Sequence, residues 1–240
     1  MRAYHHFPLN RSVKHLVAGF SIILIPLIGL FAFSLVSGID LSTVLYDLGV
    51  SAGRLFVAFI ISMILAWLLV VCFVRGKTST PTLAALDVLQ SVPTFALLPV
   101  AVHLWGPSTW TIIFLLIITV IWPIIFSIVS ALKQVNKSRE EAVIVSRIHG
   151  LDYIRYYLLP LTFPGIITGA IIGLGEGWEA IIGTEIILNT PHGLGAFFQS
   201  FSGSSSMTLF GVLIFLTIIY AVNKFIWLPL LERSHELIEE

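Results

Sequence analysis

The sequence predicts an all-α protein that crosses a membrane several times. Of its 240 residues, 57% are hydrophobic and only 11% are charged, whereas a soluble domain carries about 25% charged residues. Uncharged apolar runs of about 20 residues recur, and this is the helical length that crosses the hydrocarbon core of a bilayer. Lysine and arginine are concentrated in alternate connections between these runs, as in polytopic membrane proteins.

Six spans are expected. The first run is too long for a signal-peptide core, so it is expected to be retained as a span. The second contains one charge, Arg54, and the third and fourth are separated by a turn sequence at residues 105–109. The fifth is longer than a bilayer requires and is therefore expected to be tilted or broken. The predicted spans are residues 16–36, 50–74, 83–104, 110–132, 157–188 and 207–231.

The basic residues orient these spans. With the N-terminus inside, Arg54 and Lys224 lie within spans, and the other eleven of the thirteen basic residues lie in cytoplasmic segments. The outer loops contain none, and they comprise residues 37–49, 105–109 and 189–206. The positive-inside rule therefore predicts that both termini are cytoplasmic. The expected organisation is a tail at 1–14, a membrane domain at 15–231 and a second tail at 232–240.

Charge and cysteine content exclude several classes of site. The formal net charge is zero, which gives no indication of a nucleic-acid partner. The single cysteine, Cys72, allows no disulfide within the chain and is expected to be a small buried apolar residue. The histidines are scattered and form neither a metal-ligand set nor a serine–histidine–acid set, so no metal or cofactor is expected.

The polar connection after the fourth span, within residues 133–158, is the longest cytoplasmic segment. Ser138 and Glu141 have the spacing of a capping box that opens a helix, and Gly150 is suited to end that helix in a left-handed conformation. Asp152 is then expected to cap a second short helix. Two interpretations remain open for this segment: it docks onto another protein, or it lies on the lipid headgroups.

This segment resembles the cytoplasmic signature loop of permease subunits of ATP-binding-cassette (ABC) importers. Glu141-Ala142 is followed by Leu159-Pro160, with Pro160 nineteen residues after Glu141, as in that family. The branch that the sequence most resembles is the nitrate, sulfonate, taurine and bicarbonate permeases. Further matches to this branch are Ser51, Arg54, Leu89, Pro93, Pro99, Trp105-Gly106, Pro164, Gly169, Gly175, Trp178, Glu185 and Gly193-Leu194-Gly195. One departure is Arg147, which stands where the family usually has glycine, with Gly150 three residues later.

The resemblance implies the fold of a type I ABC importer permease with a cytoplasmic coupling helix. It implies that an ATPase docks on this loop, through Glu140, Glu141, Ala142, Arg147, Gly150 and Pro160. The expected partners are cytoplasmic ABC ATPase subunits, a second copy of the permease in a homodimer, an extracytoplasmic substrate-binding protein and membrane lipid. The chain has no Gly-x-x-x-x-Gly-Lys-Ser/Thr phosphate loop. ATP and Mg are therefore expected on the partner, the chain itself is not expected to be an enzyme, and the location is a bacterial or archaeal inner membrane.

Charged residues within spans are costly and call for a role. Glu176 and Glu179 share one helical face, and Glu185 is rotated off it. These acids either pair with Arg54 or neighbouring helices, or line the translocation pathway. If two carboxylates face the pathway, a neutral, zwitterionic or cationic solute is favoured over an anion, unless the acids are protonated. The candidates for the pathway or its gate are Glu176, Glu179, Glu185, Arg54, Pro93 and Trp178.

Glycines in the fifth span are expected to let neighbouring helices approach closely. They are Gly165, Gly169, Gly173, Gly175, Gly177 and Gly183. Two other classes of function remain possible: an intramembrane enzyme, and a stand-alone secondary transporter with charged pairs in broken helices. Neither requires a cytoplasmic coupling loop, which favours the importer permease.

Overall fold

A computed structural model describes residues 24, 28–38, 40–73, 79–133 and 150–239. Within these ranges the chain is built of helices and their connections, and no strand occurs. The all-α prediction is therefore confirmed. A short apolar helix, Ile28–Ser37, precedes the elements named below. These are α2 (Leu41–Phe73), α3 (Ser79–Gln90), η2 (Thr94–Leu97), α4 (Leu98–Trp105), α5 (Thr109–Lys133), α7 (Leu151–Tyr153), η3 (Ile154–Leu158), α8 (Leu159–Ile187), α9 (Leu194–Ser200), α10 (Ser205–Val222), η4 (Asn223–Trp227) and α11 (Leu228–Glu239).

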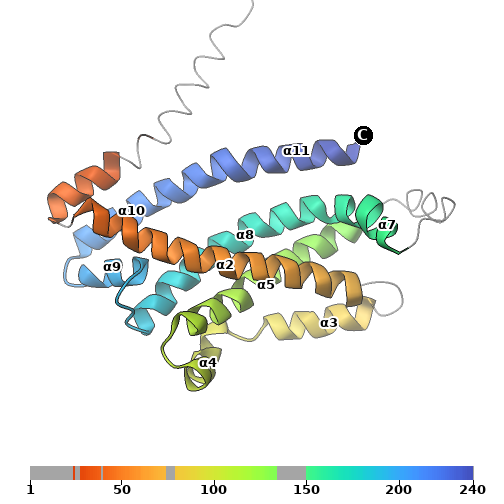
Figure 1. Cartoon of the computed structure of the whole chain (residues 1–240), viewed down its shortest axis with the longest axis horizontal. Helices are drawn as coiled ribbons and strands as arrows, with labels where there is room; N and C mark the ends of the chain where they lie inside the picture. Colours follow the sequence, from red (N-terminus) through yellow and green to blue (C-terminus); the bar gives the residue numbers. More distant parts are fainter. Residues whose placement is uncertain (1–23, 25–27, 39, 74–78, 134–149, 240) are drawn as a thin grey trace, which may run out of the picture.

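The helices α2, α5 and α8 pack together to form the centre of the molecule (Figure 1). Helix α5 is the most enclosed of the three, because side chains around much of its circumference have no exposed surface. These include Ile112, Leu115, Leu116, Val120, Ile124, Ile125 and Ile128. A second apolar cluster forms where the helix Ile28–Ser37, α2, α9 and α10 meet, around Phe33, Phe197 and Phe215.

Glycine sets the distance between α8 and α5. A Cβ on Gly165 would lie 2.7 Å from the Ser127 carbonyl oxygen, and one on Gly169 would lie 2.5 Å from Ile124 Cα. One turn further on, a Cβ on Gly173 would lie 3.0 Å from the Val120 carbonyl oxygen. The predicted close approach of backbones is therefore confirmed on this face.

The prediction was wrong for Gly175, because a Cβ there would meet nothing within 4 Å. The remaining two glycines of the fifth span face side chains rather than backbone. Gly177 lies against Leu55 and Val120, and Gly183 lies against Phe95. Gly165, Gly169 and Gly173 are four residues apart and therefore lie on the helix face that contacts α5. Gly175 is only two residues from Gly173 and lies on a different face.

Four helices in the described part of the chain are long and apolar enough to cross a membrane. They are Leu41–Cys72, Thr109–Lys133, Ile154–Ile187 and Ser205–Arg233, and they correspond to the second, fourth, fifth and sixth predicted spans. The bent pair described below raises the count to five. Most of the predicted first span lies outside the described residues, so the total of six stays a prediction.

The second span begins earlier than predicted. Helix α2 starts at Leu41, so most of the expected outer loop at 37–49 is helical. Asp40 explains this start, because its carboxylate accepts hydrogen bonds from the Ser42 amide at 3.5 Å and the Ser42 hydroxyl at 2.7 Å. These bonds hold the pKa of Asp40 below its usual value. An acidic side chain at this position stabilises the positive end of the helix dipole.

The third predicted span is not one helix. Residues Thr82–Gln90 and Thr94–Trp105 meet at an angle of 79°. Pro93 lies at the break in an extended conformation, with φ −61° and ψ 122°. Proline lacks an amide hydrogen and disfavours a helical conformation in the residue before it, so the helix ends at this point. Pro99 is accommodated in the first turn of α4, where an amide donor is not needed.

The fifth span begins directly after Gly150, whose φ of +62° is the left-handed conformation that glycine favours. Helix α7 continues through the π-helical turn η3 into α8 without a gap. The expected separate second helix is therefore absent from this part of the chain, and Asp152 lies in the first turn of the span instead of capping a short helix. Of the two alternatives expected for this span, a tilt or a break, the break does not occur, because Ile154–Ile187 is one continuous helical stretch.

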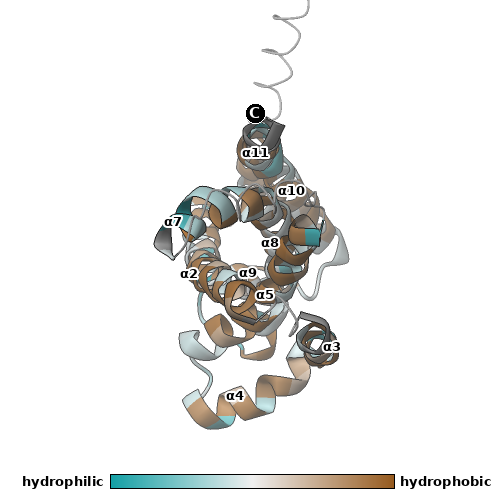
Figure 2. Ribbon diagram, turned by 90° about the vertical axis from the view of Figure 1, so that its right-hand side faces the viewer, coloured by the Kyte–Doolittle hydropathy of each residue, from teal (hydrophilic) through white to brown (hydrophobic). Residues whose placement is uncertain are grey.

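The outward faces of these helices are apolar (Figure 2). Large exposed side chains include Leu35 and Val88, each 69% exposed, and Phe56, which is 63% exposed. Cys72, which was expected to be buried, is also exposed near the end of α2. Such a surface suits lipid or another apolar partner and not water, which agrees with the membrane assignment.

Candidate functional site

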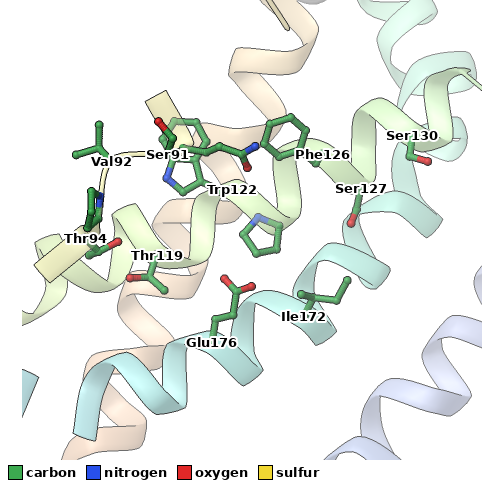
Figure 3. Close-up of a pocket in the computed structure, with 13 residues that line it drawn as sticks. Ser91, Val92, Thr94, Thr119, Trp122, Phe126, Ser127, Ser130, Ile172 and Glu176 are labelled. Carbon is green, nitrogen blue, oxygen red and sulfur yellow. The ribbon is translucent and has the colours of Figure 1, made fainter. Parts of the chain in front are cut away.

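A cavity of about 560 Å³ lies between the break after α3, one face of α5 and the middle of α8 (Figure 3). The largest share of its wall, six of thirteen lining residues, comes from α5, which presents polar and aromatic side chains to it at a helical spacing. The cavity is lined by Gln90, Ser91, Val92, Pro93, Thr94, Thr119, Trp122, Pro123, Phe126, Ser127, Ser130, Ile172 and Glu176.

Glu176 is the single ionisable side chain in this lining. Its carboxylate projects from α8 toward α5, with Thr119 beside it and Trp122 on the opposite wall (Figure 3). Pro93 lies in the same lining because it forms the break between α3 and η2. The structure therefore brings together two of the residues that the sequence indicated, Glu176 and Pro93.

The packing of α8 fixes the direction of Glu176. Gly169 and Gly173 face the backbone of α5, and Gly177 faces Leu55 of α2. Glu176 follows Gly173 by three residues and Gly169 by seven, so it lies beside the glycine contact and projects along the edge of α5. Glu179 is exposed on α8 and is not part of the cavity lining.

The α5 residues of the lining were missed by the sequence analysis. Thr119, Trp122, Ser127 and Ser130 repeat at intervals of three to five residues in an otherwise apolar span. This polar stripe is the signal that would have indicated them, since a helix that faces only lipid and apolar neighbours does not need it.

A second polar cluster, here called the Glu185 cluster, consists of Glu185, Ser51, Arg54 and Asp47 with the chain that leads into α9. Glu185 has no exposed surface and forms an ion pair with Arg54, with Oε1 2.6 Å from Nη1. The Ser51 hydroxyl lies 2.9 and 2.8 Å from the two carboxylate oxygens. The buried charge is thus neutralised and hydrogen-bonded, as a charge in a low-dielectric interior requires.

The same cluster holds the start of α9. The amide of Gly195 donates to Glu185 Oε2 at 2.9 Å, that of Leu194 donates to Ser51 Oγ at 2.8 Å, and that of Gly193 donates to Asp47 Oδ1 at 3.0 Å. These amides have no partners within the helix, because the first turn of a helix leaves its donors free. Side chains of α2 and α8 therefore satisfy the N-terminal donors of α9.

The closeness of this contact explains the glycines on either side of Leu194. A Cβ on Gly193 would lie 2.5 Å from Glu185 Oε2, and Gly193 also has a φ of +126°. A Cβ on Gly195 would lie 2.8 Å from the Ile186 amide nitrogen and would also overlap Glu185 Cβ. Only glycine fits at both positions without displacing the carboxylate.

A comparison with known protein families matches residues 58–227 to the binding-protein-dependent transport system inner membrane component family. The chain belongs to this family. The match covers the greater part of the chain, including α5, α8 and the cavity between them. Membership establishes a multi-pass membrane protein of the ABC transporter permease type, as the sequence resemblance implied.

This chain is similar in sequence to permeases that are named for different solutes. The nitrate import permease of Leptolyngbya laminosa is 33% identical over 129 residues, which cover 53% of this chain and 46% of the relative. The taurine transport system permease of Escherichia coli is 30% identical, with coverage of 48% and 42%. The bicarbonate transport system permease of Synechococcus elongatus is 29% identical, with coverage of 45% and 39%. The matched segment thus spans less than half the length of each relative.

The remaining candidate residues of this permease lie elsewhere. Trp178 packs between the two apolar clusters, with its ring centroid 5.2 Å from that of Phe215. Pro160 lies within the continuous helix, directly after the π-helical turn η3, where its missing amide hydrogen interrupts the regular helical bonding. Glu140, Glu141, Ala142 and Arg147 lie outside the described residues. Among the residues that the structure does describe, no three histidine, cysteine or acidic side chains are grouped to hold a metal ion.

Proposed function

We propose that this chain is the permease subunit of an ABC importer and forms part of the translocation pathway for a small solute. The observation that carries the proposal is the cavity beside Glu176. It is an open hollow among apolar helices, lined by polar, aromatic and apolar side chains, and its volume of about 560 Å³ lies within the range of small-molecule sites. Family membership supports the same function.

In this proposal the energy for transport comes from ATP hydrolysis on another chain. The loop at residues 138–158 docks onto a cytoplasmic ATPase subunit, which holds ATP and Mg, and a second copy of the permease completes the pathway. A binding protein outside the membrane delivers the solute, as the description of the family indicates. The distribution of basic residues supports a loop on the cytoplasmic side. Closure of the ATPase pair would draw the two loops together and rock the spans.

A stand-alone secondary transporter is the second candidate. The 79° break next to the cavity favours it, because secondary transporters place broken helices at their binding sites. The two functions differ in one requirement: a permease of this kind moves solute only with its ATPase. An intramembrane enzyme has less support, since Glu176 has no second ionisable side chain beside it in the cavity lining.

The topology of the loop provides the first test. Ala142→Cys and Ser202→Cys are made separately in a Cys72→Ser background and labelled with a membrane-impermeant maleimide in intact cells and in inverted vesicles. We expect Ala142→Cys to react only in the inverted vesicles and Ser202→Cys, in the predicted outer loop, only in the intact cells. Labelling of Ala142→Cys from outside would overturn the proposal.

The requirement for an ATPase provides the second test. The permease is purified with its ATPase subunits, reconstituted in vesicles and assayed for ATP hydrolysis with a panel of solutes and their binding protein. We expect a transported solute to stimulate hydrolysis, and we expect the Ala142→Cys side chain to cross-link to the ATPase. Solute uptake by the permease alone, without ATPase or ATP, would favour the secondary transporter.

A further inference from the structure

The charge of the solute can be inferred from the cavity wall. Glu176 is the one ionisable residue among its thirteen lining residues, which include no lysine, arginine or histidine. Glu179 lies one turn further along the same helix and adds a second negative charge nearby. The Glu176 side chain is exposed in an open cavity, so an ion that enters the cavity meets this charge directly.

The basic side chains of the described helices do not offset this charge. Arg54 is engaged by Glu185 at 2.6 Å and also donates to the His192 carbonyl oxygen at 3.1 Å. Lys133 ends α5, Arg155 lies in η3, Lys224 lies in η4 and Arg233 lies in α11. None of these four belongs to the cavity lining. The electrostatic potential in the cavity is therefore set by Glu176, which attracts cations and repels anions.

The polar groups of the wall complement a donor-rich ligand. The Thr119 hydroxyl donates to the Leu115 carbonyl oxygen at 3.0 Å, and the Ser91 hydroxyl donates to the Val88 carbonyl oxygen at 2.6 Å. Each hydroxyl has one hydrogen, so both oxygens are left to accept hydrogen bonds. Gln90 likewise uses one amide hydrogen on Asp87 at 2.6 Å.

Proline adds another acceptor to the same wall. Pro123 lies inside α5 and has no amide hydrogen, so it cannot form the usual helical bond to the carbonyl oxygen of Thr119, four residues earlier. Both residues line the cavity. The wall also holds donors, namely the Trp122 indole N–H and the second amide hydrogen of Gln90, so it is the negative charge of Glu176 that disfavours an oxyanion.

Aromatic side chains complete the wall. Trp122 and Phe126 are four residues apart on α5 and line the cavity together, across from Glu176 (Figure 3). The faces of aromatic rings attract cations, and tryptophan does so most strongly. A carboxylate, acceptor oxygens and aromatic rings around one cavity are the groups that recognise a positively charged nitrogen.

We infer that the solute of this permease is a small organic molecule that carries a cationic nitrogen, with Glu176 as its counter-ion and Trp122 and Phe126 as an aromatic wall. This inference rests on the proposed function, in which the cavity is part of the pathway. This solute class differs from nitrate and bicarbonate, the anions for which two of the relatives are named.

The test compares probes that share a benzene ring and differ in charge. The full-length permease is placed in lipid nanodiscs, and the binding of benzyltrimethylammonium, benzyl alcohol and benzenesulfonate is measured by equilibrium dialysis. We expect the ammonium probe to bind at least about tenfold more tightly than the sulfonate, the equivalent of one strong charge contact. Equal or tighter binding of the sulfonate, or no detectable binding of the ammonium probe, would overturn the inference.

Two isosteric variants test whether Glu176 causes the preference for the ammonium probe. Glu176→Gln keeps the shape of the side chain and removes its charge, and we expect it to abolish the preference for the ammonium probe. Glu232→Gln makes the same change at an exposed position of α11 outside the cavity, and we expect the preference to persist. A preference that survives in Glu176→Gln contradicts the assignment, and a folding defect is detected by size-exclusion chromatography and by retained binding of benzyl alcohol.

This binding assay uses no nucleotide, so its outcome is separate from that of the ATPase tests. A complex that couples ATP hydrolysis to transport but shows no preference for the ammonium probe would contradict only the charge of the solute. A chain that prefers the ammonium probe but transports without an ATPase would contradict the importer function and leave the charge selection of the cavity in place.

Discussion

Arg54 and Glu185 are 131 residues apart in the sequence, yet the guanidinium of one lies 2.6 Å from the carboxylate of the other. Glu185 has no exposed surface, and the Arg54 side chain is 13% exposed. The pair connects the N-terminal half of α2 to the C-terminal end of α8, and the Glu185 cluster extends this connection to the start of α9. Three segments thus depend on one buried ion pair.

Arg54→Ala is expected to destabilise the permease strongly. It leaves the Glu185 carboxylate buried without a counter-charge, and breaking such a pair costs about 3–5 kcal/mol. The free energy of unfolding is measured in mixed detergent micelles with increasing dodecyl sulfate. Arg233→Ala, at an exposed position of α11, is the matched control and is expected to change it by less than about 0.5 kcal/mol. Equal effects of the two variants would show that the ion pair contributes no stability.

Gly195→Ala is expected to displace α9 from α8. The added methyl group would overlap Glu185 Cβ and lie 2.8 Å from the Ile186 amide nitrogen. Overpacking of this kind costs about 1–3 kcal/mol. Gly203→Ala is the control, because a Cβ there meets nothing within 4 Å. The prediction is checked by thermal unfolding of the purified variants, and it is wrong if both melt at the same temperature.

Gly169→Ala is expected to separate α8 from α5. Its methyl group would lie 2.5 Å from Ile124 Cα and 2.9 Å from the Pro123 carbonyl oxygen. Because these are backbone atoms, relief requires movement of a whole helix, and we expect a loss of about 1–3 kcal/mol. Gly175→Ala, on the same helix but facing open space, is expected to be neutral or slightly stabilising. The comparison is made by unfolding in mixed micelles, and the opposite order of stabilities would refute the packing assignment.

The cavity beside Glu176 is expected to admit water and water-soluble reagents. In a Cys72→Ser background, Ser127→Cys places a thiol on the cavity wall, whereas Ile128→Cys places one at a position with no exposed surface. We expect a charged methanethiosulfonate reagent to modify the first at least about tenfold faster than the second, because only a thiolate in contact with water reacts readily. Modification is measured by mass spectrometry of the intact protein in nanodiscs. Comparable rates at the two positions would contradict an open cavity at Ser127.

The fold class, the family and the approximate positions of the second, fourth, fifth and sixth spans could be predicted from the amino-acid sequence alone. The spans follow from hydropathy summed over about 20 consecutive residues, and the family follows from motifs in a fixed order along the chain. Both can be evaluated without knowing which segments are in contact. The close packing of Gly165, Gly169 and Gly173 was also predictable, because a spacing of four residues places them on one helical face.

Which polar groups contact one another can be read only from the folded arrangement of the helices. Glu176 and Glu185 belong to the same helix, yet one lines a cavity and the other is buried against Arg54. Their different surroundings follow from the rotation of α8, which its glycine contacts with α5 set. The sharp break at Pro93 also required the structure, because a proline can lie within a continuous helix, as Pro123 does, or end one. Hydropathy is a local property of the chain, whereas helix rotation and side-chain pairing are set by contacts between residues far apart in the sequence.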